Sequence, residues 1–119
     1  MKKRYRLTGR SDFQRLLSGR RLYAGASLVG FASPGRTPLT RVGVGASRQI
    51  RGAVARNRAR RRLREAARRR LLGGGGSTEA GPGIRFDVVL IARPPALTLP
   101  FSRLEADVDE LRARFSNSN

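Results

Sequence analysis

A block of arginines in the middle of the chain is the feature that best suggests chemistry. Residues 48–70 hold eleven Arg and one Glu, a net charge of +10. Guanidinium groups stay charged and present planar donor forks that fit phosphate oxygens. Asn57 interrupts the arginines, and its amide could contact a base edge, a 2′-hydroxyl or a metal-bound water; a helix-surface or local hydrogen-bonding role is the alternative for this residue. The block therefore predicts a surface that lies against a nucleic-acid backbone; a solvated basic helix face is the alternative.

A second concentration of positive charge lies at the N-terminus. Residues 1–21 carry eight basic residues and Asp12, a net charge of +7, in a chain of 119 residues with a net charge of +18. The rest of the chain is nearly balanced. Such localised patches predict one binding surface, or two, for a polyanion.

The missing residue types limit the chemistry that the polypeptide itself could do. The chain has no His and no Cys, which removes the Ser-His triad, the Cys nucleophile and thiolate metal sites. Its carboxylates Asp12, Glu65, Glu79 and Asp87 fall on different predicted elements, whereas two-metal hydrolysis needs clustered carboxylates. Glu65 is expected to pair with an arginine three or four positions away, and Asp87 to be a structural group at a strand edge. No catalytic residue and no metal ligand is predicted.

The arginines need a helix to hold them, and residues 52–72 have the required periodicity. One apolar stripe recurs at steps of three and four and consists of Ala55, Ala59, Leu63, Ala66, Ala67 and Leu71. Because this stripe is shallow, we expect close packing on a sheet. Like charges four positions apart, such as Arg56 and Arg60, destabilise an isolated helix by a few tenths of a kcal/mol per pair. Several such pairs imply a compensating anion.

The other elements follow from shorter patterns. Ser11 and Gln14 fit a capping box that would start a first helix over residues 11–18. We predict the following further segments: one strand over 22–32 or two broken near Gly25, a strand over 40–47, a Gly-rich loop over 73–83, a doubly buried strand over 86–92, a last helix starting at Pro100 or Ser102, and a disordered tail over 116–119. The whole chain, residues 1–119, is predicted to be one small α+β sandwich domain.

The arginine block also carries a family resemblance. Its central segment, residues 52–65, reads GAVARNRARRRLRE and resembles the signature of the bacterial ribonuclease P protein subunit. Three further blocks resemble the same family in the same order: residues 2–7 with 12–13, residues 41–44 with 47–48, and residues 87–95. The resemblance covers about residues 2–112. Arginine runs alone are unspecific, but four ordered blocks at the right separations are a strong signal.

The resemblance implies a fold and a function. The fold is an α/β sandwich of order αβββαβα, also found in a ribosomal-protein domain, whose signature helix lies in a left-handed βαβ crossover. The function is that of a protein subunit assisting a catalytic RNA that removes the 5′ leader of precursor tRNA. Catalysis would be by the RNA with Mg²⁺, and the polypeptide itself would need no cofactor. The expected partners are ribonuclease P RNA, in a 1:1 complex, and precursor tRNA.

The resemblance also implies two sets of binding residues. The set facing the catalytic RNA consists of Arg48, Arg51, Arg56, Asn57, Arg58, Arg60, Arg61 and Arg64. Arg62 stands where relatives often have an apolar residue, so its place in that set is weaker. The set facing the single-stranded leader consists of Phe13, Leu17, Phe31, Arg6 and Arg10. Single strands bind by stacking on aromatic rings in a basic groove, and Leu17 replaces a common aromatic residue. Ordinary core packing is the alternative for Phe13 and Phe31.

Other classes of protein explain less of the sequence. A structural RNA-binding protein of the ribosomal type accounts for charge and size but not for the four ordered blocks. A protein nuclease lacks its residues, and a basic membrane-surface peptide would not need the buried strand over 86–92. The longest apolar run, around residues 88–92, is too short to cross a bilayer. We therefore expect a cytoplasmic protein with no membrane partner.

Overall fold

The computed structural model describes residues 6–7, 9–19, 21–34, 40–71 and 86–118. The predicted Gly-rich loop over 73–83 lies outside these residues. In chain order the elements are α1 (Arg10–Leu17), β1 (Arg21–Ala24), β2 (Leu28–Pro34), β3 (Arg41–Ala46), α2 (Ala53–Arg70), β4 (Phe86–Ala92), a short 3₁₀ helix η3 (Pro94–Leu97) and α3 (Phe101–Ser118). The apolar stretch over 22–32 is thus two strands, and η3 was not predicted.

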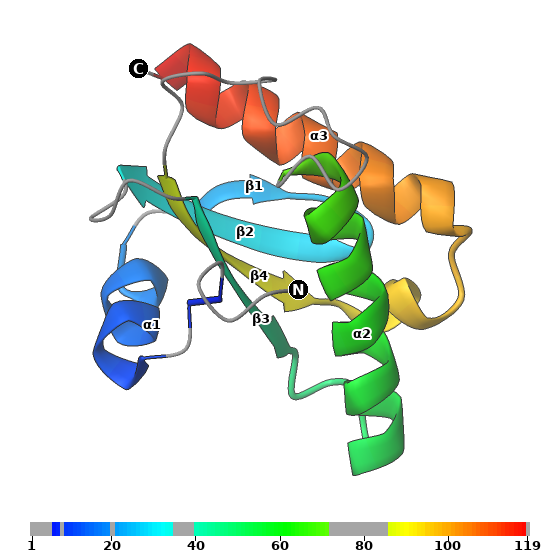
Figure 1. Ribbon diagram of the computed structural model, residues 1–119. Helices are drawn as coiled ribbons and strands as arrows, with labels where there is room; N and C mark the ends of the chain where they lie inside the picture. Colours follow the sequence, from blue (N-terminus) through cyan, green and yellow to red (C-terminus); the bar gives the residue numbers. More distant parts are fainter. Residues whose placement is uncertain (1–5, 8, 20, 35–39, 72–85, 119) are drawn as a thin grey trace.

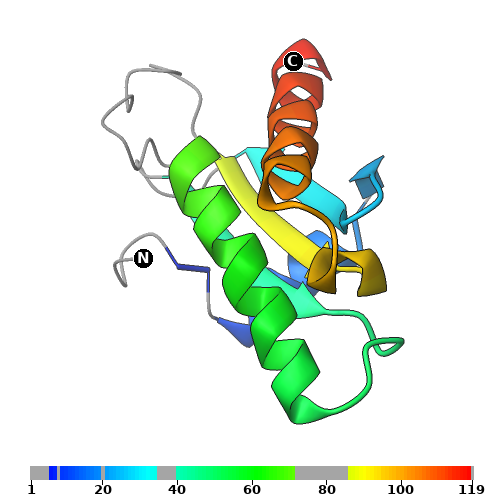
Figure 2. The ribbon, with the colours of Figure 1, turned by 90° about the vertical axis from the view of Figure 1, so that its right-hand side faces the viewer.

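The strands form a single sheet in the order β1-β2-β4-β3. β2 pairs antiparallel with β1 and β4, whereas β3 runs parallel to β4. Helices α2 and α3 cover one face, and α1 lies on the other (Figure 1). The crossover from β3 through α2 to β4 is left-handed when both views are compared (Figure 2), where most proteins have a right-handed one. The predicted sandwich and its order αβββαβα are confirmed.

The main core fills the space between the sheet and the helices α2 and α3. The predicted stripe of α2 contributes buried Ala59, Leu63, Ala66 and Ala67, while Ala55 and Leu71 are half-buried at its ends. The small alanines let α2 approach the sheet closely. In α3 one face is buried in full and consists of Leu104, Val108, Leu111 and Phe115. These two faces fix how α2 presents its arginines to solvent.

The helix boundaries correct three predictions. α1 begins at Arg10 with Gly9 as its N-cap and no capping side chain, so Ser11 lies inside the helix and the capping box there was wrong. α3 begins at Phe101, which places Ser102 inside that helix as well. α3 also continues to Ser118, so most of the predicted tail over 116–119 is helical. Within the described ranges, no helix has the length and apolar character needed to span a bilayer.

Candidate nucleic-acid interface

The N-terminal half of α2 and the turn before it bring together the residues predicted to face a catalytic RNA. Five of them are exposed and three are half-buried. The exposed five are Arg48, Arg51, Asn57, Arg58 and Arg61. Three open hollows, of about 430, 800 and 1010 Å³, lie along this part of the helix. Arginines form much of the lining of the first two, and the third lies between the start of α2 and residues 97–100. The helix thus offers a corrugated, positively charged surface to a partner.

Local hydrogen bonds hold some of these side chains in place. Arg56 donates from Nε to the carbonyl oxygen of Ile50 at 2.8 Å, which ties the first turn of α2 to the preceding turn. Arg60 donates to Oδ1 of Asn57 at 2.5 Å. The amide of Asn57 therefore orients a guanidinium and keeps its own NH₂ group available. This arrangement reduces the side-chain entropy that binding would cost.

Arg62 differs from its neighbours because it is committed to the fold. Its two terminal nitrogens donate to the carbonyl oxygens of Ala96 at 2.6 Å and Leu99 at 2.7 Å. These carbonyls belong to η3 and to the segment leading into α3. The guanidinium thus clamps this segment to α2, in agreement with the weaker RNA-binding assignment given to Arg62.

Ion pairs neutralise the last three arginines of α2. Arg68 pairs with Glu65, as expected for that carboxylate, and the hydrogen bond from Arg68 lowers the pKa of Glu65. Arg69 pairs with Glu105 and Arg70 with Asp109, both on α3. By contrast, Arg48, Arg51, Arg58 and Arg61 have no acidic partner among the residues that the structure describes. The charge available to a polyanion is therefore concentrated in the N-terminal half.

The same surface includes an apolar side chain that the sequence analysis missed. Val54 is 82% exposed in the first turn of α2 and borders two of the three hollows. A valine so exposed among arginines has no packing role in the described structure. Its only sequence signal is its place outside the apolar stripe of α2.

The residues predicted to face a leader lie mostly on the opposite side of the sheet, with α1. Phe13 and Phe31 are half-buried against a small cluster formed by Leu7, Leu16 and Val89. Leu17 is 40% exposed. Each phenylalanine therefore takes part in packing while keeping part of its ring accessible, so the core and binding interpretations are compatible.

Glycines on β3 make room for the ring of Phe13. A Cβ atom on Gly43 would lie 2.6 Å from Cε2 of Phe13 and 2.9 Å from the carbonyl oxygen of Leu7. A Cβ on Gly45 would lie 3.0 Å from Cδ1 of Ile91 and 4.0 Å from Cε1 of Phe13. The absence of a side chain at Gly43 therefore lets the ring approach the strand closely, which gives a physical reason for this glycine in the predicted strand over 40–47.

The two basic residues predicted for the leader are separated by the fold. Arg10 is exposed at the first position of α1. Arg6 forms a parallel bridge with Val42 at the edge of β3, and the amide of Leu7 donates to the carbonyl of Val42 at 2.8 Å. Arg64 of α2 feels the charge of Arg6: burial, Arg6 and Arg60 together lower the Arg64 pKa. Arg6 thus lies with α2 rather than with Phe13.

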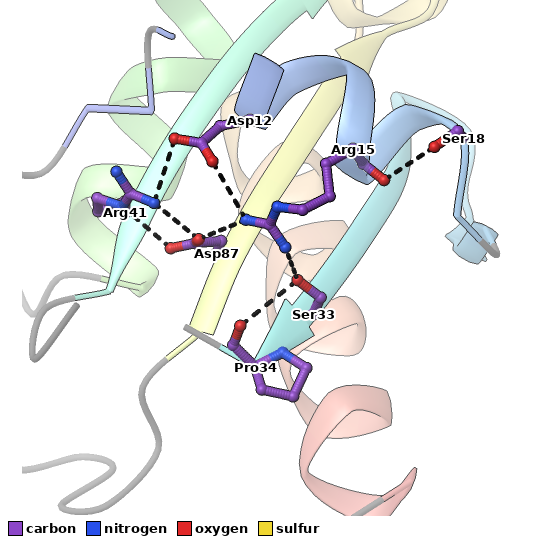
Figure 3. Close-up of polar contacts among 7 residues, drawn as sticks. All are labelled: Asp12, Arg15, Ser18, Ser33, Pro34, Arg41 and Asp87. Atoms are coloured by element: carbon purple, nitrogen blue, oxygen red, sulfur yellow. Dashed lines mark hydrogen bonds and ion pairs between the residues drawn. The ribbon is translucent and has the colours of Figure 1, made fainter. Parts of the chain in front are cut away.

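A buried network of charges fastens α1 to the sheet (Figure 3). Asp87 is fully buried and accepts from Arg15 at 2.8 Å and from Arg41 at 2.9 and 3.1 Å. Asp12 lies 3.6 Å from Arg15 and 3.5 Å from Arg41, and Arg15 also donates to Ser33 at 2.8 Å. The hydrogen bond to Asp87 raises the pKa of Arg41. The network joins α1, β2, β3 and β4.

The positions of both carboxylates agree with the sequence. Asp12 and Asp87 lie on different elements, α1 and β4, as predicted, but both approach Arg15 and Arg41. Asp87 is a buried structural group near the start of the strand β4, as predicted. Parallel pairing of β3 with β4 sets Arg41 opposite Asp87, a register that neither segment shows alone. Among the described residues, no three His, Cys, Asp or Glu side chains gather in a group that could hold a metal.

The sequence of the chain is similar to those of known proteins. Residues 1–116 match the family model named Ribonuclease P. The ribonuclease P protein component of Symbiobacterium thermophilum is 42% identical over 96% of this chain and 93% of its own length. That of Roseiflexus castenholzii is 37% identical over 96% and 88%.

The fold of the chain is similar to those of solved structures. The Staphylococcus aureus ribonuclease P protein has a TM-score of 0.68 at 22% identity, covering 97% of this chain and 98% of that one. The Thermotoga maritima protein has a TM-score of 0.67 at 22% identity, covering 89% and 93%. The fold is shared with these proteins, and the match of nearly the full length to the family model and to curated relatives shows that the chain belongs to the ribonuclease P protein component family.

Proposed function

We propose that this protein binds the catalytic RNA of ribonuclease P and the 5′ leader of precursor tRNA, and so assists the endonucleolytic cut that yields the mature 5′ end of tRNA. The reaction is carried out by the RNA with Mg²⁺, in a 1:1 complex in the cytoplasm. The polypeptide contributes binding and positioning rather than reacting groups. Family membership supports the general role, and the residues described above supply the finer parts.

The observation that carries the proposal is the uneven pairing of charge along α2. The last three arginines of the helix, Arg68, Arg69 and Arg70, pair with acids, whereas Arg58 and Arg61 project unpaired from its N-terminal half within the described structure. An unpaired basic helix face is costly to maintain because like charges repel. A polyanion removes that repulsion. RNA suits this surface because guanidinium forks recognise phosphate by shape and charge without reading a deep major groove.

Reconstitution tests the proposal directly. The purified protein would be mixed with a bacterial ribonuclease P RNA and labelled precursor tRNA at subsaturating Mg²⁺ and low ionic strength. We expect cleavage to be faster than with the RNA alone, since the protein adds binding to the leader and screens phosphate repulsion. Equal rates with and without the protein would overturn the proposal.

Phe13 is expected to bind the leader by stacking on one of its bases. Replacing Phe13 with alanine should weaken binding of precursor tRNA by the holoenzyme about 5- to 100-fold, because one stacked base is worth about 1–3 kcal/mol. Binding of mature tRNA should change little. Fluorescence titration of both tRNAs with the assembled holoenzyme measures the ratio.

Leu16→Ala is the matched control, because Leu16 lies in the same cluster but is buried. It should lower thermal stability without a selective effect on precursor tRNA. An equal loss for both tRNAs with Phe13→Ala would show that Phe13 is only a core residue.

A further inference from the structure

Arg6, from the basic N-terminal region of the sequence, is held at the edge strand β3. The described segment over residues 6–7 runs beside this strand (Figure 1). Its backbone is fixed there by the bridge between Arg6 and Val42 and by the hydrogen bond from the Leu7 amide to the Val42 carbonyl. Since β3 is the edge strand on which α2 packs, this attachment places Arg6 between the sheet edge and the helix.

The direction of the Arg6 side chain follows from its neighbour. Leu7 is 1% exposed and packs into the cluster with Leu16 and Val89 on the α1 side of the sheet. In an extended segment successive side chains point to opposite faces. Arg6 therefore points to the α2 side, away from Phe13. The influence of Arg6 on the pKa of Arg64 agrees with this placement.

The group formed by Arg6, Arg60 and Arg64 has no counter-charge. None of the three has an acidic partner among the described residues, although acids pair with the other end of α2. Arg60 and Arg64 line the hollow of about 430 Å³ together with Asn57 and Arg61. Arg64 is half-buried, so its charge is less screened by water than that of a surface arginine. Three guanidinium groups held together in this way form a site for an anion with several oxygens.

We propose that Arg6, Arg60 and Arg64 bind one backbone phosphate of the catalytic RNA between the N-terminal segment and α2. The inference rests on the function proposed above and assigns Arg6 to the catalytic RNA instead of the leader. It makes the N-terminal segment and α2 one continuous surface. Phosphate suits the site because each guanidinium can donate hydrogen bonds to its oxygens, and its negative charge reduces the repulsion among the three arginines.

The test is a double-mutant cycle on binding of ribonuclease P RNA, measured over a series of KCl concentrations. Arg6→Ala should weaken binding about 3- to 10-fold at low salt and reduce the slope of log affinity against log salt by about one, the loss expected for one phosphate contact. Arg64→Ala should do the same. The double variant should lose clearly less than the product of the two, because both side chains serve one phosphate. Arg6→Lys, which keeps the charge, should retain most of the slope.

Arg21→Ala is the matched control, since Arg21 is exposed on β1 at the opposite edge of the sheet and should leave RNA binding unchanged. Thermal denaturation of each variant checks that it folds, and Arg6→Gln replaces Arg6→Ala if the alanine variant does not. Three results would each overturn the inference. They are a loss of RNA affinity in the double variant equal to the product of the two single losses, a salt slope that Arg6→Ala leaves unchanged, and a loss of affinity for precursor tRNA alone. The function proposed above fails separately, if Arg58→Ala and Arg61→Ala also leave RNA binding intact.

Discussion

Replacing Asp87 with alanine is expected to lower the free energy of unfolding by about 3–5 kcal/mol, the usual cost of removing one partner from a buried ion pair. Asp87 is 0% exposed, and its two oxygens hold Arg15 and Arg41 at 2.8 to 3.1 Å. Without this carboxylate two partly buried guanidinium groups face each other, with only the more distant Asp12 to balance them. Urea denaturation followed by far-UV circular dichroism measures the loss.

The size of this effect matters because small domains have little stability to lose, about 5–15 kcal/mol in total. Asp109→Ala is the control, since Asp109 also pairs with an arginine but the pair is exposed. It should cost less than about 1 kcal/mol. If both variants lose the same stability, the network around Asp87 does not fasten α1 as its geometry indicates.

The second large effect concerns the exposed arginines of α2. The double variant Arg58→Ala/Arg61→Ala should weaken binding of ribonuclease P RNA about 100-fold or more at low salt, since a hydrogen bond to a charged group contributes about 1.5–3 kcal/mol, two such contacts contribute about 3 kcal/mol at the least, and 1.4 kcal/mol is tenfold. The salt slope should fall by about two. Stability should not fall, because neither side chain makes a hydrogen bond or ion pair within the described residues. Filter binding across a salt series gives both quantities.

Arg62→Ala provides the internal comparison on the same helix. Arg62 donates to the carbonyls of Ala96 and Leu99. Its removal should lower the free energy of unfolding by about 1–3 kcal/mol while leaving the salt slope for RNA unchanged. A large change of slope with Arg62→Ala would contradict the separation of binding arginines from structural ones.

The elements themselves could be predicted because each has a strong local pattern. In α2 around Leu63 and in α3 around Leu111, apolar residues recur at steps of three and four along the sequence. Residues spaced in this way lie on one face of a helix, and that face is buried. The starts of α1 and α3 could not be predicted as well. The serine–glutamine spacing that suggested a cap for α1 also occurs inside a helix, and Gly9 serves as N-cap of α1 without any side-chain signal.

The residue types of the candidate site could be predicted from the sequence, but which side chains come together in the fold could be predicted less well. Charge density along the chain indicates that Arg58 and Arg61 bind a polyanion. It does not show that Arg62 donates its hydrogen bonds within the protein, because the two carbonyl groups that accept them are 34 and 37 positions away in the sequence. The convergence of Asp12 and Asp87 likewise depends on the register between β3 and β4. Pairing over long separations is a property of the tertiary structure, and no short window of sequence contains it.

The position of β4 in the sheet has a consequence for how the protein is made. β4 is the last strand to be synthesised, yet it lies between β2 and β3 and pairs with both. Arg41 and its partner Asp87 are 46 positions apart, so closing the sheet requires a high contact order. Until β4 leaves the ribosome, β3 and α2 have no strand to join them to β1 and β2. The arginine-rich helix therefore emerges before its sheet is complete, and nascent chains are exposed to nonspecific RNA during that interval.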